Sequence, residues 1–97
     1  MTYANDVTAT IGHTPLVKIN RMLPAGTDAN VLAKMEFTNP GGSVKDRPGL
    51  AIIRAAEASG KLQPGGTIVE ATSGNTGVAL CMVGAALGYR VVISMPS

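Results

Sequence analysis

Charged and aromatic side chains are scarce in this sequence, and this scarcity argues against a nucleic-acid-binding function. Only 14% of its 97 residues are charged, against about 25% in ordinary globular proteins. The basic residues are scattered, and the aromatic residues are two tyrosines and one phenylalanine. Proteins that bind nucleic acids need a clustered basic surface and, for single strands, aromatic rings that stack on bases. The net charge of +2 is therefore a small surplus, and no nucleic-acid partner is expected.

Ligand clusters and long apolar runs are also missing. A single cysteine, Cys81, excludes an internal disulfide and a site built from several thiolates. His13 has no second histidine or carboxylate at ligand spacing, so no metal is expected. The longest apolar run, residues 78–87, is far shorter than the roughly 20 residues that span a bilayer, and no signal segment opens the chain. These features predict a soluble, cytoplasmic protein with no membrane partner.

Apolar residues, in contrast, are abundant for so small a chain. They make up 45% of the sequence, and a small domain has a large surface for its volume. With few charges to coat that surface, some apolar faces should be covered by something outside the chain. Residues 1–97 are therefore expected to form a single incomplete unit of a larger fold, or a subunit of an obligate oligomer.

Glycine and proline divide the chain into alternating strands and helices. Short apolar segments predict strands at 16–19, 31–37, 67–70 and 90–95. Longer patterns predict helices at about 43–59 and 77–87, ended by Gly60 and Gly88. The order from 31–37 to 90–95 predicts an α/β fold, a partial open and mostly parallel sheet with helices. The run 91–93 is typical of a strand packed on both faces, yet two helices cannot cover both, so one face should be bare.

The second helix is apolar on all sides, so it should be buried on more than one side. Cys81 lies within it and is expected to be a small, buried, inert thiol.

Lys45 lies where the first helix should begin, two residues before Arg47. The positive end of the helix dipole and the neighbouring guanidinium both disfavour a protonated amine, which would free it for nucleophilic attack or Schiff-base formation. The alternative is an exposed lysine whose stem carries the charge into water. Gly41 and Gly42 favour the reactive interpretation slightly, because they allow the backbone to approach a ligand closely.

The start of this helix carries two conflicting signals. Ser43 and Asp46 have the spacing of a capping box. Pro48 opposes it, because proline has no amide to donate and disfavours helical geometry at Arg47. The first helical residue is therefore left open by several positions.

The polar loop 72–77 lies between a strand and the second helix, where free amides and the helix dipole form a potential anion site. Its hydroxyl and amide side chains could hydrogen-bond a carboxylate, a phosphate or a ring substituent; they belong to Thr72, Ser73, Asn75 and Thr76. The alternative is a solvated helix cap made by Thr72 or Ser73. The loop has neither the G-x-G-x-x-G spacing nor that of a P-loop, so it is not a nucleotide motif.

Three blocks of sequence resemble a known family. Residues 11–17, 39–47 and 72–77 occur in the order found in cysteine synthases (O-acetylserine sulfhydrylases). The chain resembles the N-terminal portion of these pyridoxal-phosphate (PLP) enzymes, of fold-type II, over essentially its whole length. Cystathionine β-synthases share the same blocks.

The resemblance implies roles for particular residues. Lys45 would form the Schiff base with PLP and then remove the Cα proton of the substrate. The loop of Thr72, Ser73, Gly74, Asn75 and Thr76 would bind the substrate carboxylate, and Asn75 would also lie near the ring oxygen of the cofactor. With PLP as the electron sink, O-acetylserine would lose acetate and sulfide would add to the resulting aminoacrylate, giving cysteine.

The resemblance also implies limits. In the family, a loop that holds the cofactor phosphate and a hydroxyl that faces the pyridine nitrogen lie beyond the part that residues 1–97 match, so a truncated fragment with little activity alone is expected. The intact parent would be a homodimer. His13 stands where asparagine is common, and Pro48 where an aliphatic residue is usual. Two alternatives stay open: a cystathionine β-synthase, or a non-catalytic fragment that binds an anion or a partner.

Overall fold

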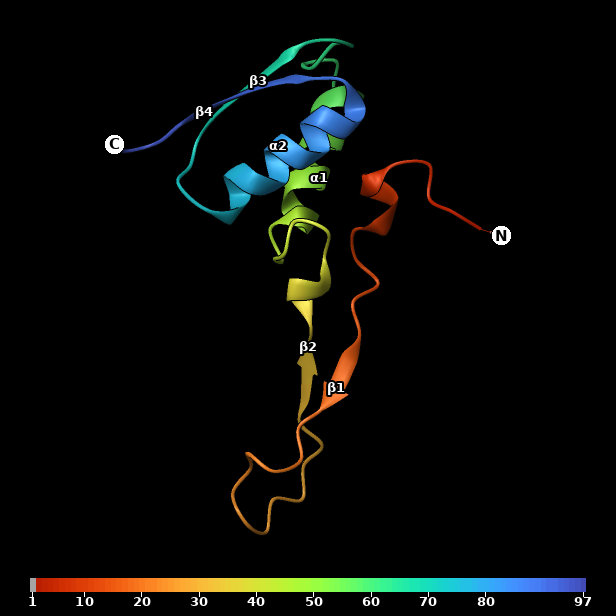
Figure 1. The fold of residues 1–97 in the computed structure, drawn as a ribbon, viewed down its shortest axis with the longest axis vertical. Helices are drawn as coiled ribbons and strands as arrows, with labels where there is room; N and C mark the ends of the chain where they lie inside the picture. Colours follow the sequence, from red (N-terminus) through yellow and green to blue (C-terminus); the bar gives the residue numbers. More distant parts are fainter. Residues whose placement is uncertain (1) are drawn as a thin grey trace.

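The computed structural model describes residues 2–97, which form an α/β body and a projecting two-stranded arm (Figure 1). In chain order the elements are the 3-10 helix η1 (Val7–Thr10), β1 (Leu16–Lys18), β2 (Leu32–Lys34), the 3-10 helix η2 (Glu36–Thr38), α1 (Asp46–Ala58), β3 (Thr67–Ala71), α2 (Asn75–Leu87) and β4 (Arg90–Ser94). Gly60 and Gly88 follow α1 and α2 with φ of 78° and 84°, which only glycine adopts without a Cβ penalty. The predicted ends of both helices are confirmed.

The strands form two separate sheets of two strands each. In the body, β3 and β4 pair in parallel, with Thr67 opposite Arg90, and α2 is the crossover between them. The arm consists of β1 and β2, which pair antiparallel, with Leu16 opposite Lys34. The α/β class with parallel pairing is confirmed. The expectation that segment 31–37 joins the parallel sheet is wrong, because its first half pairs with β1 and its second half turns into η2.

The core lies where the two helices meet the β3–β4 sheet. Its fully buried members are Ile53 of α1 with Leu80 and Val83 of α2, and Ile68 and Val91 of the sheet pack against them. Each large side chain buried in this way contributes roughly 1.5–3 kcal/mol. None of the helices in residues 2–97 has the length and hydrophobicity that a bilayer span requires.

One face of the β3–β4 sheet is bare, as the sequence predicted. Val69 is 68% exposed and Val92 is 41% exposed, because α2 covers only the opposite face. The expectation that strand 91–93 is packed on both faces is therefore not met within this chain. Cys81 is exposed as well, so its predicted burial is wrong.

The two helices lie side by side and begin at the same end of the body (Figure 1). They approach closely at Gly49, where an added methyl carbon would lie only 3.0 Å from Cβ of Ala79. Gly49 is four residues beyond Lys45, and Ala79 is four residues beyond Asn75. The contact therefore brings the starts of α1 and α2, and the two loops that precede them, to neighbouring positions.

Candidate functional site

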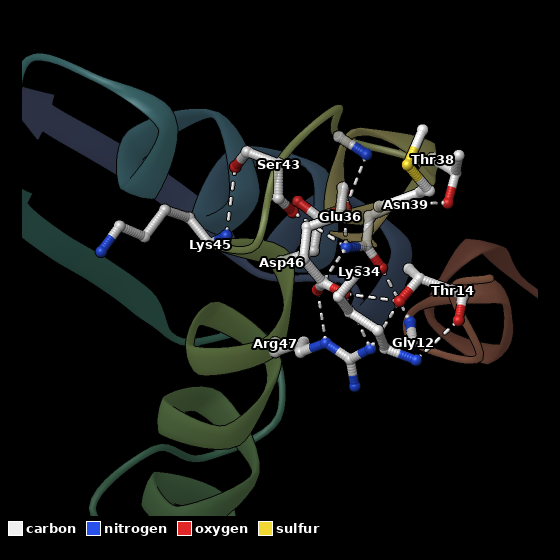
Figure 2. A network of polar contacts seen from close by, with 12 residues as sticks. Gly12, Thr14, Lys34, Glu36, Thr38, Asn39, Ser43, Lys45, Asp46 and Arg47 are labelled. Atoms are coloured by element: carbon white, nitrogen blue, oxygen red, sulfur yellow. Dashed lines mark hydrogen bonds and ion pairs between the residues drawn. The ribbon is translucent and has the colours of Figure 1, made fainter. Parts of the chain in front are cut away.

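Lys45 is the N-cap residue of α1, at the end of residues 40–45, which form a turn containing Gly41 and Gly42 (the glycine turn). Its amide donates to Oγ of Ser43 at 3.1 Å, and its carbonyl accepts from the amide of Gly49 at 2.9 Å. The side chain is exposed and extends away from the neighbouring polar network (Figure 2). No hydrogen bond or ion pair joins its ammonium to the described residues. The backbone of Lys45 is thus held while its amine is free to meet a ligand.

An ion pair anchors the first turn of α1 to the base of the arm. Nε of Arg47 donates to Oε1 of Glu36 at 2.6 Å, and Oγ1 of Thr14 donates to Oε2 at 2.5 Å. The Arg47 guanidinium, and after it the Thr14 hydroxyl, lower the pKa of Glu36 from 4.5 to about 2. The same contact with Glu36 raises the pKa of Arg47. The ammonium of Lys34 donates to the Thr14 carbonyl at 2.6 Å and extends the network into β2.

Asn39 joins the N-terminal segment to the glycine turn (Figure 2). Its side-chain oxygen accepts from the amide of Gly12 at 2.8 Å, and its side-chain nitrogen donates to the carbonyls of Glu36 at 2.9 Å and Ser43 at 3.1 Å. Asn39 is only 4% exposed. Sequence blocks 11–17 and 39–47 are therefore neighbours in space, with Lys45 on the far side of the turn that they fix.

The start of α1 differs from the predicted capping box. Asp46 does not reach back to Ser43; its Oδ2 instead accepts from the amide of Gly41 at 2.6 Å. Arg47 is helical although proline follows it. Pro48 removes no hydrogen bond, because it lies in the first turn, where an amide would have no partner inside the helix. The capping-box prediction is wrong because the glycine turn brings a backbone donor closer to the Asp46 carboxylate than any group of the helix.

Loop 72–77 enters α2 without a side-chain cap. Gly74 is the N-cap residue, and no side chain makes a capping hydrogen bond there. The Thr72 amide donates to the Ser94 carbonyl at 3.0 Å, which ties the loop to the end of β4. Ser73 and Asn75 are exposed and Thr76 is half-buried. The capping alternative for Thr72 and Ser73 is thus not realised, and the positive end of the α2 dipole faces outward beside polar side chains.

A cleft of about 530 Å³ opens beside this loop, within the roughly 300–1,000 Å³ of small-molecule sites. Its polar wall consists of Thr72, Ser73, Gly74 and Asn75, and its apolar wall of Gly77, Val78, Cys81, Ile93 and Met95. A methyl group added at Gly74 would meet no atom within 4 Å, so the loop faces open space. Thr76 and Lys45 do not line this cleft.

The site therefore consists of two neighbouring helix starts with different chemistry. Lys45 precedes α1 and presents an exposed amino group, whereas Gly74 and Asn75 at the start of α2 lie beside amides, hydroxyls and a cleft. Each helix start carries a partial positive charge of about 0.5, which favours an anion between them. Sequence reasoning found both loops but missed Glu36, because its role depends on a partner eleven residues away.

The chain is similar to known proteins over almost its whole length. The sequence profile of a family described as "Pyridoxal-phosphate dependent enzyme" matches residues 7–97. Cysteine synthase 1 of Emericella nidulans is 52% identical over 95 residues, which are 98% of this chain and 25% of that protein. The chain thus spans about a quarter of the length of this relative.

Two solved structures have a similar fold over this chain. The crystal structure of O-ureido-L-serine synthase is 54% identical with a TM-score of 0.89, over 97% of this chain and 29% of that one. The O-acetylserine dependent cystathionine β-synthase from Helicobacter pylori is 36% identical with a TM-score of 0.88, over 100% of this chain and 32% of that one.

Proposed function

The chain belongs to the pyridoxal-phosphate dependent enzyme family, and from this premise we propose that it is part of a cysteine synthase that makes cysteine from O-acetylserine and sulfide. The observation that carries the proposal is the free amine of Lys45 at the start of α1, next to the uncapped start of α2. The identity to a fungal cysteine synthase over nearly the whole chain supports it. Residues 1–97 would then be one unit of a β-replacement enzyme that works as a homodimer.

Pyridoxal phosphate is the cofactor of this family, and the residues present fit it. Addition to an aldehyde requires an unprotonated amine, and a carboxylate partner would favour the protonated form. The Lys45 amine has no such partner among the described residues. An anionic cofactor and an amino-acid carboxylate both require donors, which two helix starts and the loop side chains provide. When bound, the cofactor supplies an electron sink for the bonds at the substrate α-carbon.

Residues of this chain would attach the cofactor, transfer a proton, bind the substrate carboxylate and exclude water. Lys45 would hold the cofactor through its amine and would take the proton from the substrate α-carbon. Thr72, Ser73, Gly74, Asn75 and Thr76 would hold the substrate carboxylate, with Asn75 at the first turn of α2 also beside the cofactor ring. The cleft wall of Val78 and Ile93 would exclude water on one side.

Covalent labelling of Lys45 tests the proposal directly. The protein, expressed from its complete coding region, is mixed with pyridoxal phosphate, reduced with borohydride and digested for mass spectrometry. We expect the label on Lys45, its loss in Lys45→Ala, and no change in Lys61→Ala, which removes an exposed lysine beyond the other end of α1. A label spread over several lysines, or one that survives in Lys45→Ala, would refute the proposal.

A cystathionine β-synthase is the second candidate, favoured by the TM-score of 0.88 to the Helicobacter pylori enzyme. Both candidates need the same lysine and carboxylate loop, so labelling cannot separate them. Steady-state rates with O-acetylserine and either sulfide or homocysteine as the acceptor do separate them. A higher kcat/KM with sulfide supports the cysteine synthase, and a higher value with homocysteine replaces it.

A further inference from the structure

Asp46, the residue after Lys45, is the one charged side chain that is buried within residues 2–97, at 0% exposure. It begins α1, yet it faces into the polar network while Lys45 is directed away from it (Figure 2). Neither the attachment of a cofactor nor the binding of a carboxylate uses it. A buried carboxylate beside the proposed catalytic lysine therefore needs its own physical account.

The Asp46 carboxylate lies directly against the backbone of Gly41. Its Oδ2 accepts the Gly41 amide at 2.6 Å. A methyl group added at Gly41 would lie 2.9 Å from Cγ of Asp46, and closer still to Oδ1. Only glycine leaves room for this contact. The hydrogen bond closes a loop of six residues in which Lys45 is the last residue before the helix.

The arrangement is costly for stability alone. Oδ1 of Asp46 is buried without a hydrogen-bond partner among the described residues, and an unpaired buried oxygen of a charged group carries a large desolvation cost. The positive end of α1 offsets part of this cost, because Asp46 lies in the first turn. A neutral side chain of similar size would fill the same space without that cost. What it would lack is the acceptor that holds the Gly41 amide.

We propose that Asp46 is a positioning residue for Lys45: its carboxylate clamps the Gly41 amide and thereby fixes the backbone from which the lysine amine reaches the cofactor. The inference rests on the proposed role of Lys45. The backbone of Lys45 is held from three directions: by Ser43 at its amide, by Gly49 at its carbonyl, and through the clamp of Asp46 on Gly41. Without the clamp the glycine turn regains its freedom, and the amine samples a wider range of positions.

Two variants at Asp46 isolate the clamp. Asp46→Ala removes the acceptor, so the turn is released. Asp46→Asn keeps the shape and one acceptor oxygen for the Gly41 amide but loses the charge. If the clamp is what matters, Asp46→Asn retains cofactor capture and Asp46→Ala loses it. In Gly41→Ala the added methyl group displaces the Asp46 carboxylate from the Gly41 amide. Its rate of cofactor capture should therefore resemble that of Asp46→Ala.

The control variant must lower the stability of the fold without changing the glycine turn. Tyr89→Phe removes the hydrogen bond from the Tyr89 hydroxyl to Oε2 of Glu57, at 2.5 Å, near the opposite end of α1. This bond links α1 to the segment between α2 and β4 and lies far along the helix from Lys45. Tyr89→Phe is therefore expected to lower the melting temperature and to leave the turn intact.

The experiment measures the rate of borohydride-trapped labelling of Lys45 by pyridoxal phosphate, with the melting temperature of each variant recorded alongside. It uses the protein expressed from its complete coding region and is run well below all melting temperatures. We expect Asp46→Ala and Gly41→Ala to slow labelling by at least about tenfold, as misplacement of a reacting group does. Asp46→Asn should stay within about threefold of the parent, and Tyr89→Phe should label at the parent rate.

Each other result has one meaning. Labelling of Asp46→Ala at the parent rate overturns the positioning role, and so does a Tyr89→Phe rate as slow as that of Asp46→Ala. If Asp46→Ala does not fold, slow labelling in a folded Asp46→Asn overturns the role of the acceptor. A parent protein that shows no label on Lys45 removes the proposed function itself, which separates the two failures.

Discussion

Substitution of Gly49 by alanine should impair the site more than it impairs the fold. Gly49 is the point where α1 and α2 touch, four residues into α1 from Lys45. An alanine methyl there would lie 3.0 Å from Cβ of Ala79, whereas carbon atoms in contact are about 3.5–4.0 Å apart. The two helices must therefore separate by a few tenths of an ångström at this level.

The two effects of Gly49→Ala on stability, better helix propensity and overpacking, largely cancel. Alanine is better than glycine inside a helix by about 1 kcal/mol, and overpacking of a tight contact costs about 1–3 kcal/mol. The free energy of unfolding should therefore fall by no more than about 2 kcal/mol. The effect on function is not offset in this way. A displacement of 1 Å between a reacting group and its substrate site can cost about a hundredfold in rate, so a shift of a few tenths of an ångström is expected to cost about threefold to tenfold.

The assay compares urea unfolding with the rate at which pyridoxal phosphate labels Lys45 and with KM for the amino-acid substrate. Gly49→Ala should raise KM and slow labelling while most of the stability remains. The matched control is the double variant Gly49→Ala with Ala79→Gly, which moves the methyl group across the contact and restores the spacing. Full labelling and an unchanged KM in Gly49→Ala, or no recovery in the double variant, would contradict the idea that this contact sets the distance between the two loops.

Three further outcomes are expected. Because Arg47 lowers the pKa of Glu36 from 4.5 to about 2, the Glu36 charge stabilises the fold fully above pH 4.5, and this contribution is lost as the pH falls towards 2. Glu36→Gln should flatten the decline of the melting temperature over that range, and an equally steep decline would count against the ion pair. Leu80→Ala should lower the free energy of unfolding by about 2–5 kcal/mol in urea titration, because Leu80 is buried in the only core of residues 2–97. A smaller loss would mean that the surrounding side chains move in to fill the cavity. His13 has a φ of 52°, so His13→Val should lower the free energy of unfolding by about 1–2 kcal/mol, whereas His13→Asn should change it very little. Equal melting temperatures for the two variants would rule out backbone strain at this position.

Features that depend on neighbouring residues could be predicted from the sequence. Gly60 and Gly88 end the helices because a positive φ is a local property of glycine. A helix follows the polar segment as predicted, because the sequence changes there from polar residues to an apolar run. It begins at Asn75, two residues before the predicted start at 77. The order of blocks 11–17, 39–47 and 72–77 indicated the family, which the family match over residues 7–97 confirms. The roles assigned to Lys45 and to loop 72–76 stay predictions.

The sequence by itself determined the order of the helices and the strands of the body and the C-terminal ends of both helices, because those features follow from backbone preferences over a few residues. The tertiary structure decided which distant groups meet. Arg47 reaches Thr14 across 33 positions, Tyr89 reaches Glu57 across 32, and β2 pairs with β1 instead of β3. Asp46 shows the difference at short range. Its spacing from Ser43 predicts a capping box, yet its carboxylate accepts a hydrogen bond from the Gly41 amide, because the folded turn places that donor nearer.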